Sequence, residues 1–207
     1  MLKSDGAHDH HEDGCRELLK EYVRRNVDFA DAELEAFCEP FSRRTVARNA
    51  FLLKAGQVCR FEGFVTRGCF RLYAVDPRGR EKVLYFAGPD WWVTDIDSFT
   101  NQVPAQLSIQ ALEGSELLVI SKTDKERLYA EMPKVEKLFR IMGQKTLVAL
   151  QRRLIGTHSL TAEERYLLFF STYPEIARRL TNVHIASYLG VTPEFVSKIR
   201  RILATRR

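Results

Sequence analysis

The chain has 207 residues, of which 45% are hydrophobic and 29% are charged. This composition excludes a disordered chain, and the length favours two small domains over one large domain. The sequence has no apolar run of about 18 residues and no signal-like apolar stretch at its start, so we expect a cytoplasmic protein without a membrane anchor.

The net charge of +5 is unevenly distributed along the chain. Residues 140–207 hold 12 Lys and Arg against 4 Asp and Glu, whereas residues 1–139 hold 20 against 23. A basic C-terminal third is typical of a chain that meets the phosphates of a nucleic acid. A solvated basic surface would give the same counts, so charge alone leaves both interpretations open.

The polar N-terminal segment is expected to form a flexible tail over residues 1–14. A histidine-rich and acidic cluster in this tail could instead hold a divalent metal: His8, Asp9, His10, His11, Glu12 and Asp13. We expect no metal or cofactor site elsewhere, because the four cysteines form no C-x-x-C pair and are interpreted as reduced thiols: Cys15, Cys38, Cys59 and Cys69.

A sensor domain is expected over residues 15–132. Helical signals come first, over residues 15–38, with Asp31 as the cap of a second short helix. From Arg43 to Ser121 the sequence consists of short apolar runs separated by Gly and Pro turns. This pattern predicts an antiparallel sandwich or barrel. These runs are TVAR (45–48), VCRF (58–61), FRLYAV (70–75), KVLYF (82–86), LSIQAL (107–112) and ELLVI (116–120).

A long helix is predicted over residues 133–156. Its apolar positions approximate a seven-residue repeat, which suits a dimer interface formed by Leu138, Ile141, Met142, Val148 and Ile155. Packing of this stripe against the chain's own barrel is the alternative. Residues Gly156 to Ser159 are expected to break the helix, and Thr161 with Glu164 forms a capping box that opens the last domain, over residues 157–207.

The segment 180–203, LTNVHIASYLGVTPEFVSKIRRIL, predicts a helix-turn-helix. Two short helices that cross steeply need a small residue at their contact and a permissive turn, which Ala186 and Gly190 provide. Apolar residues on both sides of the turn supply the buried faces. The outward face is expected to bind DNA in the major groove, through Thr192, Pro193, Glu194, Ser197, Lys198 and Arg201.

The order of parts resembles the Crp/Fnr family of bacterial transcription regulators. Residues 64–92, FVTRGCFRLYAVDPRGREKVLYFAGPDWW, are similar to the middle of the family's β-roll. The runs LTAEERYLLFF (160–170) and IASYLGVTPEFVSKIRR (185–201) resemble the Bacteroidetes-type branch. The resemblance implies an α+β protein with an N-terminal antiparallel β-roll, a cyclic-nucleotide-binding-like jelly roll with flanking helices, followed by the long helix and an all-α helix-turn-helix domain. The family's usual two-stranded wing has no counterpart before Arg207.

The resemblance also implies where an effector would bind. Members that bind cyclic AMP carry a Gly-Glu pair and an Arg-Ser pair, and Val93-Thr94 and Ala105-Gln106 are interpreted as the matching positions here. No cation remains for a cyclic phosphate, so we expect an unidentified effector other than cyclic AMP. A mixed aromatic and polar pocket is expected from Trp91, Trp92, Thr94, Gln106, Leu150 and Gln151, although the tryptophans could instead be core residues.

The sequence therefore predicts a homodimeric, sequence-specific regulator of transcription that binds double-stranded DNA. Its alternative is an interaction module with an empty β-roll and a degenerate helix-turn-helix that does not bind DNA. An enzyme is not expected, because the sequence shows no nucleophile elbow, phosphate loop, paired metal ligands or clustered catalytic carboxylates.

Overall fold

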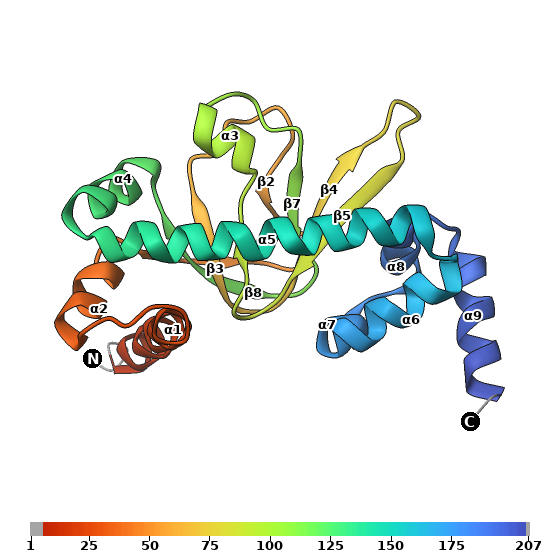
Figure 1. Ribbon diagram of the computed structural model, residues 1–207, viewed down its shortest axis with the longest axis horizontal. Coiled ribbons are helices and arrows are strands. Elements are labelled where there is room, and N and C mark those ends of the chain that lie inside the picture. The colour runs from red at the N-terminus through yellow and green to blue at the C-terminus, as the bar shows by residue number, and fades with distance from the viewer. Residues whose placement is uncertain (1–5, 206–207) are drawn as a thin grey trace, which may run out of the picture. The chain divides into compact units, whose positions relative to one another are not determined.

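A computed structural model describes residues 6–205, with side chains over residues 14–203 (Figure 1). The chain divides into two compact units. The first unit runs to Arg71 and resumes over Ala87–Gly143, and the second combines Leu72–Phe86 with Gln144–Arg207. The sequence assigns residues 72–86 to the sensor domain, whereas the structure groups most of this β-hairpin with the C-terminal helices.

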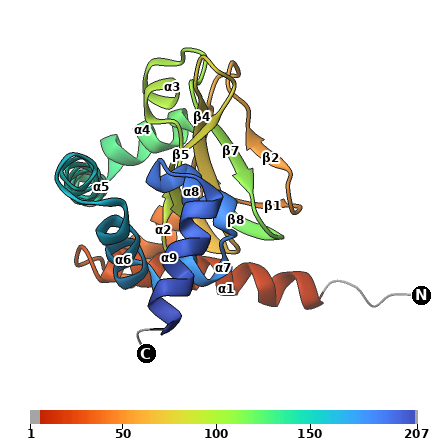
Figure 2. The ribbon, with the colours of Figure 1, turned by 90° about the vertical axis from the view of Figure 1, so that its right-hand side faces the viewer.

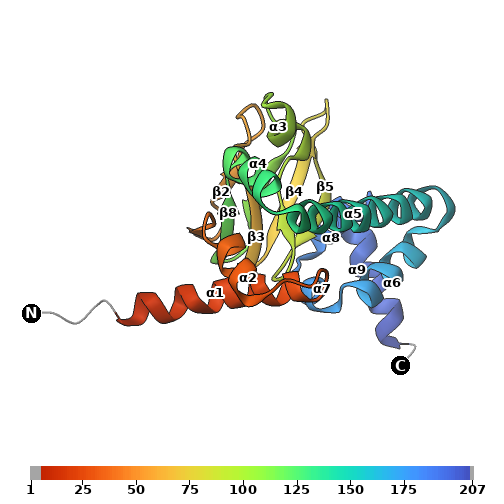
Figure 3. The ribbon, with the colours of Figure 1, turned by 60° about the vertical axis from the view of Figure 1, so that its left-hand side comes forward.

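Two helices open the first unit, α1 (Gly6–Arg24) and α2 (Asp31–Cys38). Buried Cys15, Leu19 and Val23 hold α1 along one side of strands β3 (Glu62–Arg67) and β8 (Ser115–Ile120) (Figure 3). The backbone is already helical from Gly6, so most of the segment expected to be a flexible tail belongs to α1. The side chains of His8 to Asp13, with their predicted metal cluster, lie outside the described residues.

Eight strands form two four-stranded sheets, in the orders β1-β8-β3-β6 and β2-β7-β4-β5. In the first sheet β8 pairs antiparallel with both β1 and β3, and in the second β2 pairs antiparallel with β7. This architecture confirms the predicted antiparallel β-roll. The strands are β1 (Ser42–Val46), β2 (Phe51–Leu53), β3 (Glu62–Arg67), β4 (Phe70–Val75), β5 (Glu81–Ala87), β6 (Trp92–Val93), β7 (Ser108–Ala111) and β8 (Ser115–Ile120).

One predicted strand is wrong. The run 58–61 makes only an isolated bridge between Val58 and Pro104, because a proline offers no N–H to extend a ladder. The strand instead begins at Glu62. The tight turn from β3 to β4 depends on Gly68, whose φ of +91° and closeness to Ser115 leave no room for a side chain.

The core of the first unit lies between α1, α2 and the first sheet. Its fully buried members include Phe37, Phe64 and Leu118, and Phe139 of the long helix joins them. Two short helices complete the unit, α3 (Ile96–Asn101) and α4 (Lys122–Glu131). All four cysteines are buried free thiols, as expected from their spacing, and burial raises the pKa of Cys38 to about 12.

A buried ion pair crosses this core. Lys125 on α4 is bonded to Glu62 on β3, and the side chains are 11% and 2% exposed. The Lys125 ammonium also lies 3.9 Å from the ring centroid of Phe139. Charge pairing and the electron-rich ring face together compensate the loss of water around the ammonium.

The long helix α5 (Pro133–Ser159) leads to four further helices in the second unit: α6 (Ala162–Thr172), α7 (Pro174–Arg179), α8 (Asn182–Leu189) and α9 (Pro193–Thr205). The break expected from Gly156 is wrong, since α5 continues to Ser159 and the Leu160 N–H still bonds the Gly156 carbonyl at 3.0 Å. The predicted capping box of Thr161 and Glu164 is present, and its hydrogen bonds lower the pKa of Glu164. Among the described residues, no helix is long and apolar enough to span a membrane.

Candidate nucleic-acid interface

The turn between α8 and α9 has the geometry that the sequence predicts for a helix-turn-helix (Figure 2). The Thr181 hydroxyl caps α8 by accepting the His184 N–H at 3.3 Å. Gly190 ends this helix with φ of 72°, a left-handed conformation that glycine adopts without strain. The Val191 N–H then bonds the Ala186 carbonyl at 3.0 Å, which fixes the turn tightly on the end of α8.

The second helix starts at a capping residue and is anchored by its apolar face. The Thr192 hydroxyl accepts the Phe195 N–H at 3.3 Å, and Pro193 occupies the first helical position, where its missing N–H costs nothing. Val196 and Ile199 are 0% and 3% exposed, so they hold α9 in the second unit. On α8 the matching buried residues are Ile185, Ala186 and Leu189.

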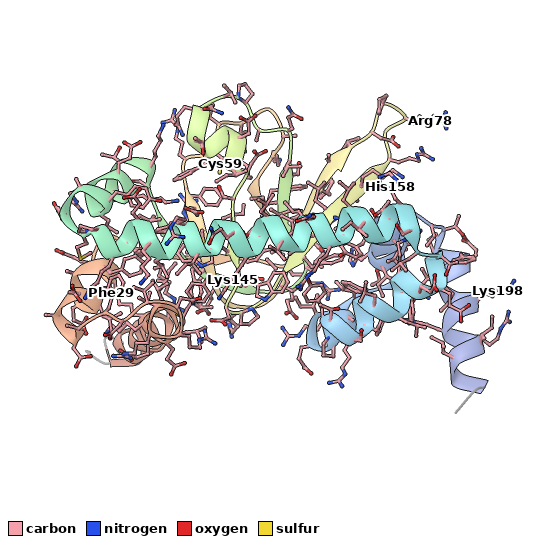
Figure 4. The ribbon with its side chains drawn as sticks, in the orientation of Figure 1. Phe29, Cys59, Arg78, Lys145, His158 and Lys198 are labelled. Atoms are coloured by element: carbon pink, nitrogen blue, oxygen red, sulfur yellow. The ribbon has the colours of Figure 1, made fainter. Side chains whose placement is uncertain are left out.

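The opposite face of α9 is exposed and polar. Five of the six residues predicted to bind DNA are exposed, and Pro193 is half-buried: the exposed ones are Thr192, Glu194, Ser197, Lys198 and Arg201. Figure 4 shows Lys198 projecting outward from α9. The structure therefore brings the predicted residues together on one helix face.

Two of these residues are partly used within the protein. The Ser197 hydroxyl donates to the Pro193 carbonyl at 3.0 Å and accepts from the Asn182 amide at 2.8 Å, which ties α9 to the start of α8. The Glu194 carboxylate bonds its own backbone N–H and the Thr192 hydroxyl, and these bonds lower its pKa. Lys198 and Arg201 are exposed cations on this face.

Sequence reasoning missed one exposed apolar residue on the same helix. Phe195 is 39% exposed and follows Glu194 directly. The sequence could have indicated this exposure. Adjacent residues of a helix point about 100° apart, so Phe195 cannot share the buried face of Val196. Arg200, by contrast, is directed inward, because its Nε donates to the Tyr166 hydroxyl at 3.2 Å.

The predicted effector-pocket residues are divided between the two units, with Leu150 and Gln151 in the second and the others in the first. Trp92 belongs to an aromatic cluster of the first core, with its ring centroid 5.3 Å from Phe64 and 5.4 Å from Phe139. The Thr94 hydroxyl donates to the Phe61 carbonyl at 3.0 Å. Leu150 and Gln151 belong to the second unit and are exposed. For Trp92, the alternative interpretation as a core residue fits the structure.

Asp95 is the residue of this region that sequence reasoning missed. Its carboxylate is buried and accepts three backbone N–H groups, from Ser98 at 3.2 Å and from Gln106 and Leu107 at 3.1 Å each. It therefore caps α3 and closes the loop that precedes β7. The available signal was an aspartate in the N-cap position, directly before the first residue of a short helix.

The apolar stripe of α5 divides into a buried part and an exposed part. Leu138 is 1% exposed, and Ile141 and Met142 pack on the first core, while the dimer role of these three residues stays a prediction. Val148 and Ile155 are 43% and 56% exposed. A second row, with the three- and four-residue spacing of a coiled-coil seam, is also exposed: Leu147, Leu150 and Leu154.

Comparison with known proteins agrees with this architecture. The cyclic nucleotide-binding domain family matches residues 43–132. A probable transcriptional activator from Rhizobium leguminosarum bv. viciae is 27% identical over 169 residues, which cover 75% of this chain and 68% of that protein.

Solved structures with a similar fold include the following two. FixK2 from Bradyrhizobium japonicum is 17% identical with a TM-score of 0.72, covering 80% of this chain and 85% of that chain. A putative regulator of the Crp/Fnr family from Eubacterium rectale is 16% identical with a TM-score of 0.67, covering 86% and 85%.

The chain combines a β-roll that matches the cyclic nucleotide-binding domain family with a helix-turn-helix. The family match covers residues 43–132, which is less than half of the chain. Membership of the Crp/Fnr family, and of its Bacteroidetes-type branch, stays a prediction.

Proposed function

We propose that this protein is a sequence-specific DNA-binding regulator of transcription that acts as a homodimer. The observation that carries the proposal is the exposed face of α9, which presents Lys198 and Arg201 while Val196 and Ile199 fix the helix from behind. A helix held in this way can enter the major groove without rearranging its own unit. Regulation at an operator would place the protein in the cytoplasm.

Base recognition would fall to the first turns of α9. Lys198 can donate to the guanine acceptors of the major groove, and the half-buried Pro193 lets the backbone of the helix start approach the DNA. Arg201, one turn further on, would bind a phosphate or a second base. Phe195 adds an apolar edge that suits the methyl group of thymine.

The dimer would form through α5, with an exposed leucine row added to the seam that the sequence predicts. Leu147, Leu150 and Leu154 are 66%, 46% and 60% exposed, and an exposed leucine row at this spacing is stable in water when a second helix covers it. An isologous pair of α5 helices would present two α9 helices to half-sites about one helical turn apart.

The effector would differ from a cyclic nucleotide. Buried Ala105 supplies no charge, and the neighbouring N–H groups of Gln106 and Leu107 are already bonded to the Asp95 carboxylate. A bound phosphate would therefore meet an existing anion rather than free donors. Control by another small molecule, or by none, follows from this arrangement.

Lys198→Ala tests the groove assignment. We expect the variant to lose about 1 to 3 kcal/mol of binding free energy on its best duplex and to lose base preference at one position of each half-site. Binding sites selected from a random duplex pool, followed by affinity measurements on single-base changes, would show the effect.

Lys145→Ala is the matched control, because Lys145 is an exposed lysine of the same unit that lies on α5 rather than α9 (Figure 4). It should leave base preference unchanged. Equal loss of base preference in both variants would contradict the assignment of Lys198 to the groove.

A further inference from the structure

The β4–β5 hairpin ends its sheet with a free edge. β5 is the outermost strand in the order β2-β7-β4-β5, so alternate backbone groups along it have no neighbouring strand. The Arg80 carbonyl accepts from the Asp76 N–H inside the hairpin, which directs the backbone groups of Glu81 and Val83 toward the free edge. Exposed groups of this kind need partners from elsewhere.

A serine of the helix-turn-helix supplies two of these partners. The Ser187 hydroxyl on α8 accepts the Val83 N–H at 3.1 Å and donates to the Glu81 carbonyl at 2.7 Å. One hydroxyl thereby takes the place that a neighbouring strand would fill. Only a side chain that both donates and accepts can do this, so alanine at position 187 would remove one hydrogen bond from each of the two backbone groups.

An arginine of α5 supplies the third. Arg153 Nη2 donates to the Val83 carbonyl at 2.9 Å and to the Tyr188 carbonyl at 3.0 Å, and its guanidinium lies 4.2 Å from the Tyr188 ring centroid. Burial lowers the pKa of this guanidinium. Arg153 therefore joins β5 and α8 from a third element, α5, within the same unit.

Aromatic packing backs these hydrogen bonds. Phe86 at the end of β5 is 5.7 Å from Tyr188 and 6.1 Å from Phe169 of α6, measured between ring centroids. Phe169 and Tyr188 are 4.7 Å apart. The hairpin is thus held to the helices by an aromatic cluster as well as by its edge.

We propose that Ser187 and Arg153 form a clasp that fixes the helix-turn-helix to the edge of β5 and thereby sets the orientation in which α9 is presented to DNA. The inference rests on the proposed DNA-binding function and adds its positioning residues. None of the four hydrogen bonds involves α9, so the clasp leaves the exposed face of α9 free for DNA. The clasp therefore pre-organises the DNA-binding helix rather than masking it.

Ser187→Ala in the full chain tests the clasp at two levels. Amide exchange at Val83 should accelerate about tenfold or more, because its N–H loses its partner. Affinity for a two-half-site duplex of the selected spacing should fall about three- to tenfold, whereas affinity for a single half-site should not change. The variant should also lose less affinity than the wild type when one base pair is added between the half-sites.

Two controls and one rescue separate positioning from general damage. Ser171→Ala removes an exposed hydroxyl on α6 that bonds only its own helix, at the Leu168 carbonyl, and should change neither exchange at Val83 nor spacing preference. Arg153→Met should relax the spacing preference as Ser187→Ala does, while Arg152→Met removes an equal charge from the exposed neighbour without this effect. Ser187→Thr keeps the hydroxyl and should restore wild-type spacing preference.

The outcomes are distinguishable. Faster exchange at Val83 with relaxed spacing preference supports the clasp. Exchange or spacing preference that stays at the wild-type value in Ser187→Ala overturns its positioning role. A wild-type protein that fails to bind any duplex contradicts the proposed function itself, before the clasp variants are compared.

Discussion

Replacing Lys125 by methionine is expected to lower the free energy of unfolding of the first unit by about 3 to 5 kcal/mol. The Glu62 carboxylate is 2% exposed and would remain buried in the core without its cation. Lys125 also lies 5.5 Å from the ring centroid of Phe99 and 5.7 Å from that of Tyr129, so the ammonium fills an aromatic cage that methionine fills only in part. Removing one member of such a pair costs more than the pair itself contributes.

Denaturant unfolding followed by tryptophan fluorescence measures this loss, because both tryptophans, Trp91 and Trp92, belong to the first unit. Lys122→Met is the matched control on the same helix, since its ion pair with Glu126 is exposed and contributes less than about 1 kcal/mol. Combining Lys125→Met with Glu62→Leu should recover part of the stability. A loss in Lys125→Met no larger than in Lys122→Met would contradict the account of this buried pair.

Placing lysine at Leu147 and Leu154 together is expected to weaken dimerisation by about three orders of magnitude. The two positions are 66% and 60% exposed within one chain, so the monomer should fold with the charges in water. In a helix pair the same charges would face like charges across an apolar seam. Sedimentation at micromolar concentration would then show a folded monomer.

Ala149→Lys provides the control, because Ala149 is exposed on α5 but lies outside the row of Leu147, Leu150 and Leu154. This variant should remain dimeric. A wild-type chain that sediments as a monomer, or a double variant that remains a dimer, would contradict the proposed seam.

The local chemistry of the sequence accounts for most of the fold. Short apolar runs between Gly and Pro turns predict the β-roll, and Thr161, Gly190 and Thr192 predict helix ends that the structure confirms. These features can be predicted from the sequence because each depends on neighbours within a few residues. The helix-turn-helix was predictable for the same reason.

Contacts between residues that are far apart in the chain could not be predicted from the sequence. The stripe of α5 has one period along its length, yet Leu138 is buried in the chain's own core while Leu147 is exposed. The pattern shows that one face of the helix is apolar, but it does not show which part of the protein or which partner covers that face. Asp95 was missed for the same reason. Its carboxylate accepts the N–H groups of Gln106 and Leu107, which only the fold brings close to it.

The most direct test of the central claim is the salt dependence of binding to duplex DNA. A fluorescently labelled duplex selected from a random pool would be titrated with the full chain at several salt concentrations. If α9 and the basic second unit contact the phosphates, the affinity should fall about a thousandfold between roughly 50 and 200 mM salt, with a linear relation between the logarithms of affinity and salt concentration. Absence of duplex binding at low salt, or an affinity that does not change with salt, would contradict the assignment of this protein as a DNA-binding regulator.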